Sequence, residues 1–165
     1  MKNVMDLNRD LEKLKKEKQA VLIAHFYQEP EIQDAADYVG DSLGMALYAA
    51  KQDCKIAVVA GVRFMAETAK ILSPTKTVVI PDLTAGCSLA DSCPAPELAR
   101  WKAAHPDHLV VSYINCTAGV KALSDYIVTS SNAEKIIRAL PPGRPVLFAP
   151  DKNLGAYLVK KTGRA

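Results

Sequence analysis

The sequence predicts an α/β fold made of two copies of one unit, each with a small parallel sheet between helices. Strand-like apolar runs alternate with helical patterns along all 165 residues, which favours right-handed βαβ crossovers and parallel sheets. Continuous apolar runs such as 21–26 and 109–114 are typical of strands buried on both faces. A shift of 88 positions places residues 109–130 on residues 21–42 without a gap. A fixed period of this kind indicates a duplicated supersecondary unit.

The repeat rests on pattern and register, because few of the aligned residues are identical. The offset of 88 aligns His25-Phe26-Tyr27 with Tyr113-Ile114-Asn115, Asp37-Tyr38 with Asp125-Tyr126, Ser42 with Ser130, Val58-Val59 with Val146-Leu147, and Thr68-Ala69 with Ala156-Tyr157. We predict one domain over residues 1–86 and a second over residues 87–165 that is incomplete at its C-terminal end. By this offset the equivalent of Cys87 would fall near position 175, so we expect the sequence to be truncated.

In the first half, each expected element follows from a local pattern. Leu7, Leu11 and Leu14 share one face and predict an opening helix over 6–18. After the strand over 21–26, Pro30 opens a short helix, because proline is tolerated in a first helical turn. The remaining expectations are a brief strand at Val39, a helix through Ala50 with Ser42 as its N-cap, strands over 56–60 and 77–80, a helix over 63–72, and a loop over 83–92.

In the second half the same alternation recurs. We expect helices over 96–104, 119–123, 132–140 and 152–160, and strands over 109–114, 126–128 and 146–148. The boundary between the two lobes is expected in the loop and helix between Pro81 and His105.

Composition narrows the class of protein. The hydrophobic fraction of 49% and the charged fraction of 24% are ordinary for a globular protein. A net charge of +3, with no cluster of Lys and Arg interleaved with aromatics, argues against a nucleic-acid partner. No apolar stretch approaches the length of a membrane span, and charged residues interrupt the N-terminus early, so we expect neither a membrane segment nor a signal peptide.

The four cysteines show neither CxxC pairs nor zinc-finger spacing. We therefore expect a cytoplasmic protein with reduced thiols, in which Cys54 and Cys116 are packing residues. Cys87 lies in a glycine-containing loop after a strand, a place suited to a metal ligand or a reactive thiol. Cys93 precedes a proline at a helix start, where the helix dipole could lower its pKa. Spacing alone does not favour a metal site.

Polar residues follow the predicted strands at matching positions in the two copies. Ligands of open parallel sheets bind beyond the carboxyl ends of the strands. His25, Tyr27, Tyr113 and Asn115 occupy such ends, and Ser42 and Ser130 lie where helices begin. Helix starts carry N–H groups without helical partners and the positive end of the dipole, so two of them suit a dianion such as a dicarboxylate or a phosphate.

Each of these residues also has a purely structural explanation. A His or Tyr at the end of a buried strand can simply complete the core, and a serine before a helix can be only a cap. The repeat favours binding, because a structural strand end has no need of polar residues in both copies. The structural explanation stays open at this point. If binding is correct, His25 can move a proton near neutral pH, a tyrosine can supply a phenolic proton, and Asn115 can orient a carboxylate.

Taken together, eight runs resemble the quinolinate synthase (quinolinate synthetase A) family. They are Ala24-His25-Phe26-Tyr27-Gln28, Gly40-Asp41-Ser42-Leu43, the run 63–69 (RFMAETA), the run 85–91 (AGCSLAD), Tyr113-Ile114-Asn115, the run 121–125 (KALSD), the run 129–133 (TSSNA) and the run 150–155 (PDKNLG). They occur in order along essentially the whole chain, and the combination is highly specific. The chain resembles the N-terminal two-domain portion of that family.

The resemblance implies an enzyme of de novo NAD biosynthesis. Members condense iminoaspartate (iminosuccinate) with dihydroxyacetone phosphate, losing phosphate and water, to give quinolinate. The family fold has three similar α/β domains around a pseudo-threefold axis, with a central [4Fe-4S] cluster whose open iron acts as a Lewis acid. An enzyme that supplies iminoaspartate, L-aspartate oxidase or aspartate dehydrogenase, is the implied partner.

The resemblance also implies residue roles. Cys87 matches a cluster ligand, and Tyr27, together with His25, matches the groups implicated in proton transfer. The expected substrate-binding residues are His25, Ser42, Tyr113, Ile114, Asn115 and Ser130. Phe64, Met65 and Glu67 are expected to be packing residues. Because cluster ligation takes three or four protein ligands, we expect this chain alone to be colourless and inactive.

Two other classes of function are kept open. The first is a non-catalytic α/β module that binds a dicarboxylate or a phosphate. The second is a redox-sensing domain that uses Cys87 and Cys93.

Overall fold

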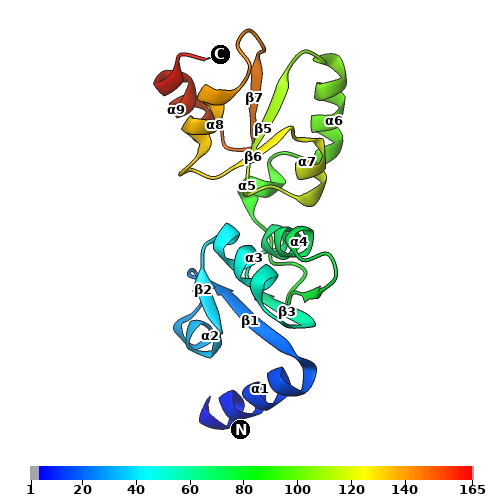
Figure 1. The fold of residues 1–165 in the computed structure, drawn as a ribbon, viewed down its shortest axis with the longest axis vertical. Helices are drawn as coiled ribbons and strands as arrows, with labels where there is room; N and C mark the ends of the chain where they lie inside the picture. The colour runs from blue at the N-terminus through cyan, green and yellow to red at the C-terminus, as the bar shows by residue number, and fades with distance from the viewer. Residues whose placement is uncertain (1–3, 165) are drawn as a thin grey trace. The chain divides into compact units, whose positions relative to one another are not determined.

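The computed structural model describes residues 4–164 and divides into two compact units, Met1–Gly86 (unit 1) and Cys87–Ala165 (unit 2). Each unit has a small parallel sheet with helices on both faces (Figure 1). The predicted α/β class, with repeated lobes and small parallel sheets, is confirmed. Across residues 4–164, none of the helices is both long and apolar enough to span a lipid bilayer.

Unit 1 begins with a helix and then alternates strands and helices. Its elements are α1 (Val4–Lys18), β1 (Ala20–His25), α2 (Pro30–Ala35), β2 (Tyr38–Gly40), α3 (Ser42–Lys51), β3 (Ile56–Ala60), α4 (Arg63–Leu72) and β4 (Thr77–Val79). Within the described residues they form a four-stranded sheet of order β2-β1-β3-β4 with parallel neighbours. The bounds of β3 and α4 match the expectation, and Pro30 and Val39 lie in the short helix and strand expected for them.

Unit 2 repeats this alternation. Its elements are α5 (Ser88–Asp91), α6 (Ala95–Ala104), β5 (Leu109–Tyr113), α7 (Ala118–Leu123), β6 (Tyr126–Val128), α8 (Ala133–Ala139), β7 (Val146–Ala149) and α9 (Lys152–Thr162). In the part of the chain that the structure describes, the sheet has three strands in the order β6-β5-β7, again parallel. One helical turn, α5, lies where we expected only loop, because a four-residue helix leaves no periodic signal in the sequence.

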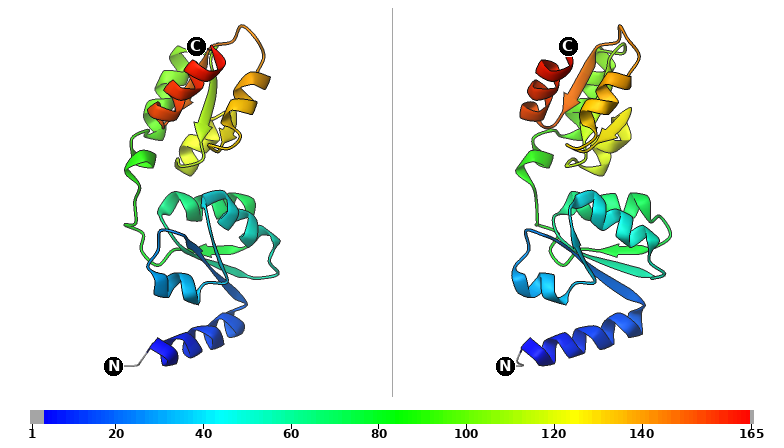
Figure 2. Two further views of the ribbon diagram at one scale, coloured as in Figure 1. Left: turned by 90° about the vertical axis from the view of Figure 1, so that its left-hand side faces the viewer. Right: turned by 60° about the vertical axis from the view of Figure 1, so that its left-hand side comes forward.

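The sheet of each unit is buried between two pairs of helices, as Figure 2 shows from two further sides. In unit 1, Leu22 and Ala24 of β1 pack against α1 and α2, while α3 and α4 contribute buried residues such as Met45 and Phe64. In unit 2, Val110 packs with α6 and α7, and Leu109 and Val111 pack with α8 and α9. Successive side chains of a strand point to opposite faces, so a continuous apolar run serves both layers.

The structure refines the repeat. His25 of β1 pairs with Gly40, and Tyr113 of β5 pairs with Val128, so both partners keep the offset of 88. The next strand does not, because Val21 pairs with Ala57 whereas Leu109 pairs with Val146, which corresponds to an offset of 89. Our alignment of Val58-Val59 with Val146-Leu147 is therefore wrong by one residue. The extra residue lies between α8 and β7, in a loop whose Gly143 has a φ of +80°.

The same shift corrects the last helix pair. α4 begins at Arg63 and α9 at Lys152, again 89 residues apart. Ala69 therefore matches Leu158, and both are buried, whereas our alignment placed Ala69 on Tyr157, which is 52% exposed. Burial identifies the correct partner because only equivalent positions face equivalent layers.

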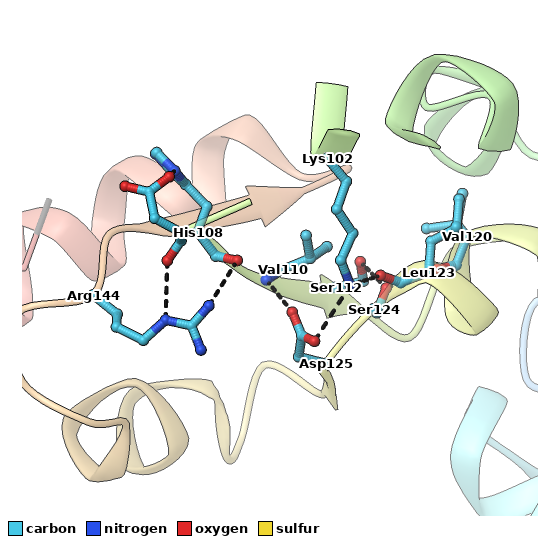
Figure 3. A network of polar contacts seen from close by, with 10 residues as sticks. Lys102, His108, Val110, Ser112, Val120, Leu123, Ser124, Asp125 and Arg144 are labelled. Carbon is cyan, nitrogen blue, oxygen red and sulfur yellow. Dashed lines mark hydrogen bonds and ion pairs between the residues drawn. The ribbon is translucent and has the colours of Figure 1, made fainter. Parts of the chain in front are cut away.

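One aspartate in each unit ties the first strand to its neighbours. The Asp37 carboxylate accepts from the Leu22 N–H at 2.7 Å, and the Asp37 N–H donates to the Leu22 carbonyl at 2.8 Å. The Asp125 carboxylate likewise accepts from the Val110 N–H at 2.7 Å (Figure 3). The Asp125 N–H donates to the Val110 carbonyl at 2.8 Å. A lysine from the helix before the strand completes each tie.

The lysines differ in burial. Lys15 is buried and lies 2.7 Å from the Asp37 carboxylate, and Lys102 lies 3.3 Å from that of Asp125. Burial opposes the charge of Lys15, but its hydrogen bonds to Asp37 and Glu12 outweigh burial and leave its pKa raised. Burial likewise opposes the charge of Asp125, but the Val110 N–H and Lys102 outweigh it and lower the pKa of that carboxyl.

We expect Asp37→Ala and Asp125→Ala each to lower the free energy of unfolding of its unit by about 2 kcal/mol, the range for hydrogen bonds to a charged group. Each change leaves a strand N–H without its acceptor and removes one carboxylate partner from the lysine. Urea denaturation of this chain, followed by circular dichroism, measures the loss. Asp34→Ala, at an exposed position of α2, is the matched control and should stay within about 0.5 kcal/mol of the parent chain. Two aspartate variants as stable as this control would contradict the role of the ties.

Candidate functional site

In unit 1, three of the predicted site residues lie at the carboxyl ends of two neighbouring strands. β1 ends at His25 and β2 ends at Gly40, and these two residues are paired. Tyr27 follows β1 by two residues, and Ser42 follows β2 by two residues as the first residue of α3. The parallel register therefore brings these side chains to one edge of the sheet, which is the edge where open α/β sheets bind ligands.

The ring of His25 is enclosed by its own loop. It is 5% exposed, stacks on Phe26 with ring centroids 4.3 Å apart, and meets the edge of Tyr27 at 4.4 Å. The backbone N–H of Tyr27 donates to Nδ1 of His25 at 3.3 Å. Because Nδ1 accepts, the neutral ring carries its proton on Nε2, where it can be donated to an anion.

Burial lowers the pKa of His25, and the negative charge of Asp41 opposes this only in part. The ring is therefore neutral at neutral pH and acts as a hydrogen-bond donor through Nε2 rather than as a cation.

Tyr27 and Ser42 differ in access to solvent. Tyr27 is 81% exposed, so its hydroxyl can reach a ligand, whereas Ser42 is buried in the first turn of α3. The N-cap of α3 is Asp41, whose carboxylate accepts from the Gly44 N–H at 2.6 Å, so our assignment of Ser42 as the cap is wrong by one residue. Either residue type can cap a helix, and only the backbone geometry decides between two adjacent candidates.

Unit 2 presents an equivalent group. β5 ends at Tyr113, which pairs with Val128 at the end of β6. Asn115 follows β5 by two residues and Ser130 follows β6 by two, so both occupy the positions of Tyr27 and Ser42 in unit 1. Tyr113 and Asn115 are partly buried, and Ser130 is exposed.

Ser130 does not lie at a helix start, contrary to our expectation. It is in a turn, and α8 begins only at Ala133 after its N-cap Asn132. The amide oxygen of Asn132 accepts from the Thr129 N–H at 2.8 Å, and this closes the turn ahead of the helix. The side chain of Ile114 is buried, and its backbone N–H donates to the Val128 carbonyl at 2.8 Å.

The cysteines of unit 2 differ in burial. Cys116 is fully buried, as expected of a packing residue, and Cys87 is partly exposed at the N-cap position of α5. Burial raises the pKa of the Cys93 thiol, and the charge of Glu97 adds to this. Our expectation that a helix dipole lowers this pKa is wrong, because desolvation of the thiolate dominates. A protonated Cys93 also argues against a redox sensor built on it.

Cys87 is not part of a complete metal site in the residues described. Between residues 4 and 164, no three side chains of His, Cys, Asp or Glu are grouped so that they could hold a metal ion. A thiolate at this position can therefore serve as one ligand only, and any cluster would need further ligands from outside the described residues.

Each group of site residues offers hydrogen-bond donors of the kind that bind carboxylates and phosphates. Unit 1 supplies an imidazole N–H and hydroxyls, and unit 2 supplies hydroxyls and an amide. The sequence assigned no role to Gln33 or Lys121, whose side chains donate to carbonyls of the loops that carry these groups. The offset of 88, which pairs these two positions, was the signal that could have found them.

We expect the pKa of His25 to lie below 6.5, its ordinary value, because burial disfavours the charged ring. The folded chain then binds fewer protons than the unfolded chain. The contribution of His25 to stability is therefore complete above pH 6.5 and is lost as the pH falls through the folded-state pKa. A ¹⁵N NMR titration of the imidazole measures the pKa, with His25→Gln to assign the signal. A pKa at or above 6.5 would contradict the burial described here.

We expect Cys93 to react with iodoacetamide more slowly in the folded chain than in the urea-unfolded chain at the same pH. Its raised pKa leaves less thiolate, which is the reactive form. Mass spectrometry of the peptide that contains Cys93, sampled over time, gives both rates. Equal rates in the two states would show that burial does not protect the thiol.

The chain is similar to known proteins over nearly its whole length. The family described as quinolinate synthetase A protein matches residues 9–165. The quinolinate synthase of Trichodesmium erythraeum is 62% identical over 159 residues, which is 96% of this chain and 49% of that protein. That of Synechocystis sp. is also 62% identical, over 96% of this chain and 50% of that protein, and that of Thermosynechococcus vestitus is 60% identical over 97% and 50%.

The chain thus spans about half the length of the curated relatives that it matches. The family match covers both units, including the strand ends and the loop of Cys87. At an identity near 60% over nearly the whole chain, this chain and these relatives share one fold. The chain belongs to the quinolinate synthetase A family.

Proposed function

We propose that this chain is the N-terminal half of a quinolinate synthase, and that the whole enzyme condenses iminoaspartate with dihydroxyacetone phosphate to quinolinate in de novo NAD biosynthesis. The observation that carries the proposal is the family match over residues 9–165, together with its relatives named quinolinate synthase. The donor groups at the strand ends of both units support it, because iminoaspartate carries two carboxylates.

The proposed binding roles follow from the chemistry of each side chain. Nε2–H of His25 and the hydroxyls of Ser42 and Ser130 donate to substrate carboxylates. Tyr113 and Asn115 add a phenol and an amide. Ile114 is proposed as a binding residue by its place at the same strand end, although its side chain is buried and its N–H donates to the Val128 carbonyl. Charge-assisted hydrogen bonds of this kind are about twice as strong as neutral ones, which suits recognition of a dianion.

Proton transfer is proposed for Tyr27 and His25. The side chain of Tyr27 is exposed, and the centroids of the Tyr27 and His25 rings are 4.4 Å apart. The two groups can therefore act on the same ligand. The lowered pKa of His25 keeps the imidazole neutral, so its proposed part in the transfer is the hydrogen bond that Nε2–H donates to the reacting group.

Cys87 is proposed as one thiolate ligand of a [4Fe-4S] cluster. When bound, such a cluster supplies Lewis-acid chemistry at an iron that has no protein ligand. The described residues contribute this single ligand, so the other ligands belong to the rest of the enzyme. We propose a cytoplasmic enzyme with no nucleic-acid or membrane partner, supplied with iminoaspartate by an L-aspartate oxidase or an aspartate dehydrogenase.

We expect Cys87→Ala in the full-length protein to abolish both the cluster absorption and quinolinate formation, because the cluster then lacks a thiolate. Anaerobic reconstitution followed by visible spectroscopy and a quinolinate assay gives both readouts. Cys93→Ala is the matched control and should retain both, and the 165-residue chain alone should be colourless and inactive.

The alternative function, a module that only binds a dicarboxylate or a phosphate, gives the opposite result. A Cys87→Ala protein that keeps its ligand affinity, from a parent that neither holds a cluster nor forms quinolinate, would favour the module. A cluster band from the 165-residue chain would contradict the assignment of a single ligand to this half.

A further inference from the structure

We propose that Gln33 and Lys121 are equivalent positioning residues, each of which clamps the loop that follows the first strand of its unit and so fixes the site residues on that loop. The inference rests on the proposed function, because those loops carry Tyr27 and Asn115. Neither residue is proposed to touch substrate.

In unit 1 the clamp is an amide. Gln33, on α2, donates from Nε2 to the Phe26 carbonyl at 3.3 Å and to the Gln28 carbonyl at 2.7 Å. These carbonyls belong to the residue before Tyr27 and the residue after it, so one side chain binds the backbone on both sides of Tyr27. The N–H of Gln33 makes the ordinary first-turn helical bond to the carbonyl of the N-cap residue Glu29, at 3.1 Å.

In unit 2 the clamp is an ammonium group. Lys121, on α7, donates from Nζ to the Ile114 carbonyl at 2.9 Å and also to the Cys116 carbonyl. These carbonyls flank Asn115. The N–H of Lys121 likewise makes the first-turn helical bond to the N-cap residue Thr117, at 3.0 Å, so Gln33 and Lys121 occupy the same position in their helices.

The two clamps coincide residue by residue under the offset of 88. Gln33 matches Lys121, Phe26 matches Ile114, and Gln28 matches Cys116. An amide and an ammonium differ in charge and length, yet each donates to the same pair of carbonyls. What the units share is therefore the clamped loop and not the clamping group, which indicates that the loop geometry is the property that matters.

The unit 1 clamp reaches the predicted proton-transfer group through the backbone. The N–H of Tyr27, between the two clamped carbonyls, is the donor to Nδ1 of His25. A loop that moves loses this hydrogen bond, and Nδ1 then no longer has to be the unprotonated nitrogen. Gln33 thereby fixes both the place of Tyr27 and the tautomer of His25, although it contacts neither side chain in the bonds described.

Exchange of the two clamps tests the proposal in the full-length protein. Lys121→Met and Gln33→Met remove the donors at similar length, whereas Lys121→Gln and Gln33→Lys install the group that the other unit uses. We expect each Met variant to lose about tenfold or more in kcat/KM for quinolinate formation, since small misplacements of binding groups are costly. We expect each swapped variant to keep most of the wild-type kcat/KM. Lys135→Met, at an exposed position of α8, is the control for loss of a lysine.

A second readout separates positioning from general destabilisation. Hydrogen exchange of the amides at 26–28 and 114–116 should accelerate in the matching Met variant and return in the swapped variant, while exchange of β1 and β5 stays unchanged. The ¹⁵N shifts of His25 should show mixed tautomers only in Gln33→Met. A variant that fails to fold would show faster exchange throughout the chain. The swapped variant at the same position is then compared with the wild-type protein instead.

Three results would overturn the clamp. They are Met variants with unchanged kcat/KM and unchanged local exchange, swapped variants as impaired as the Met variants, and acceleration in β1 and β5 equal to that in the loops. Failure of the proposed function would give a different result from failure of the clamp. A wild-type protein that forms no quinolinate would end that proposal, while the exchange measurements would still decide whether the loops are clamped.

Discussion

The aspartate tie is the interaction on which each unit depends. In a parallel sheet the second strand is reached only after a crossover, so its register on the first strand must be set by contacts distant in sequence. Asp37 and Asp125 set it by joining the start of the second strand to a backbone N–H and carbonyl of the first. A lysine of the helix before the first strand binds the same carboxylate, so the aspartate also joins that helix to the sheet. One residue therefore fixes the strand pairing and the helix on one face.

The register has a direct consequence for chemistry. Because His25 pairs with Gly40 and Tyr113 with Val128, the residues two positions beyond each strand end are brought to the same edge of their sheet. At these positions Tyr27 and Ser130 are exposed and Asn115 is partly buried, whereas Ser42 is buried in the first turn of α3. In the proposed function this edge binds the ligand, and the sheet beneath it holds the polar side chains in place.

The state of His25 shows how the local fold sets the properties of a site residue. Its ring is desolvated by Phe26 and Tyr27, which keeps it neutral, and the backbone of Tyr27 fixes the tautomer. The same three residues therefore determine where the ring lies, whether it is charged, and which nitrogen carries the proton. A solvent-exposed histidine would have none of these properties fixed.

The sequence by itself determined the fold class, nearly every strand and long helix, the duplication, and the strand-end candidates, because hydrophobic period and turn residues act over short distances. It also carried the resemblance that pointed to the family. Only the tertiary structure decided that Asp41 and not Ser42 caps α3, that Ser130 precedes its helix, and that the repeat slips to 89 residues after α8. It likewise decided that Cys93 is desolvated and that Gln33 and Lys121 hold the loops. These depend on burial and on contacts between separate elements, which a local pattern does not encode.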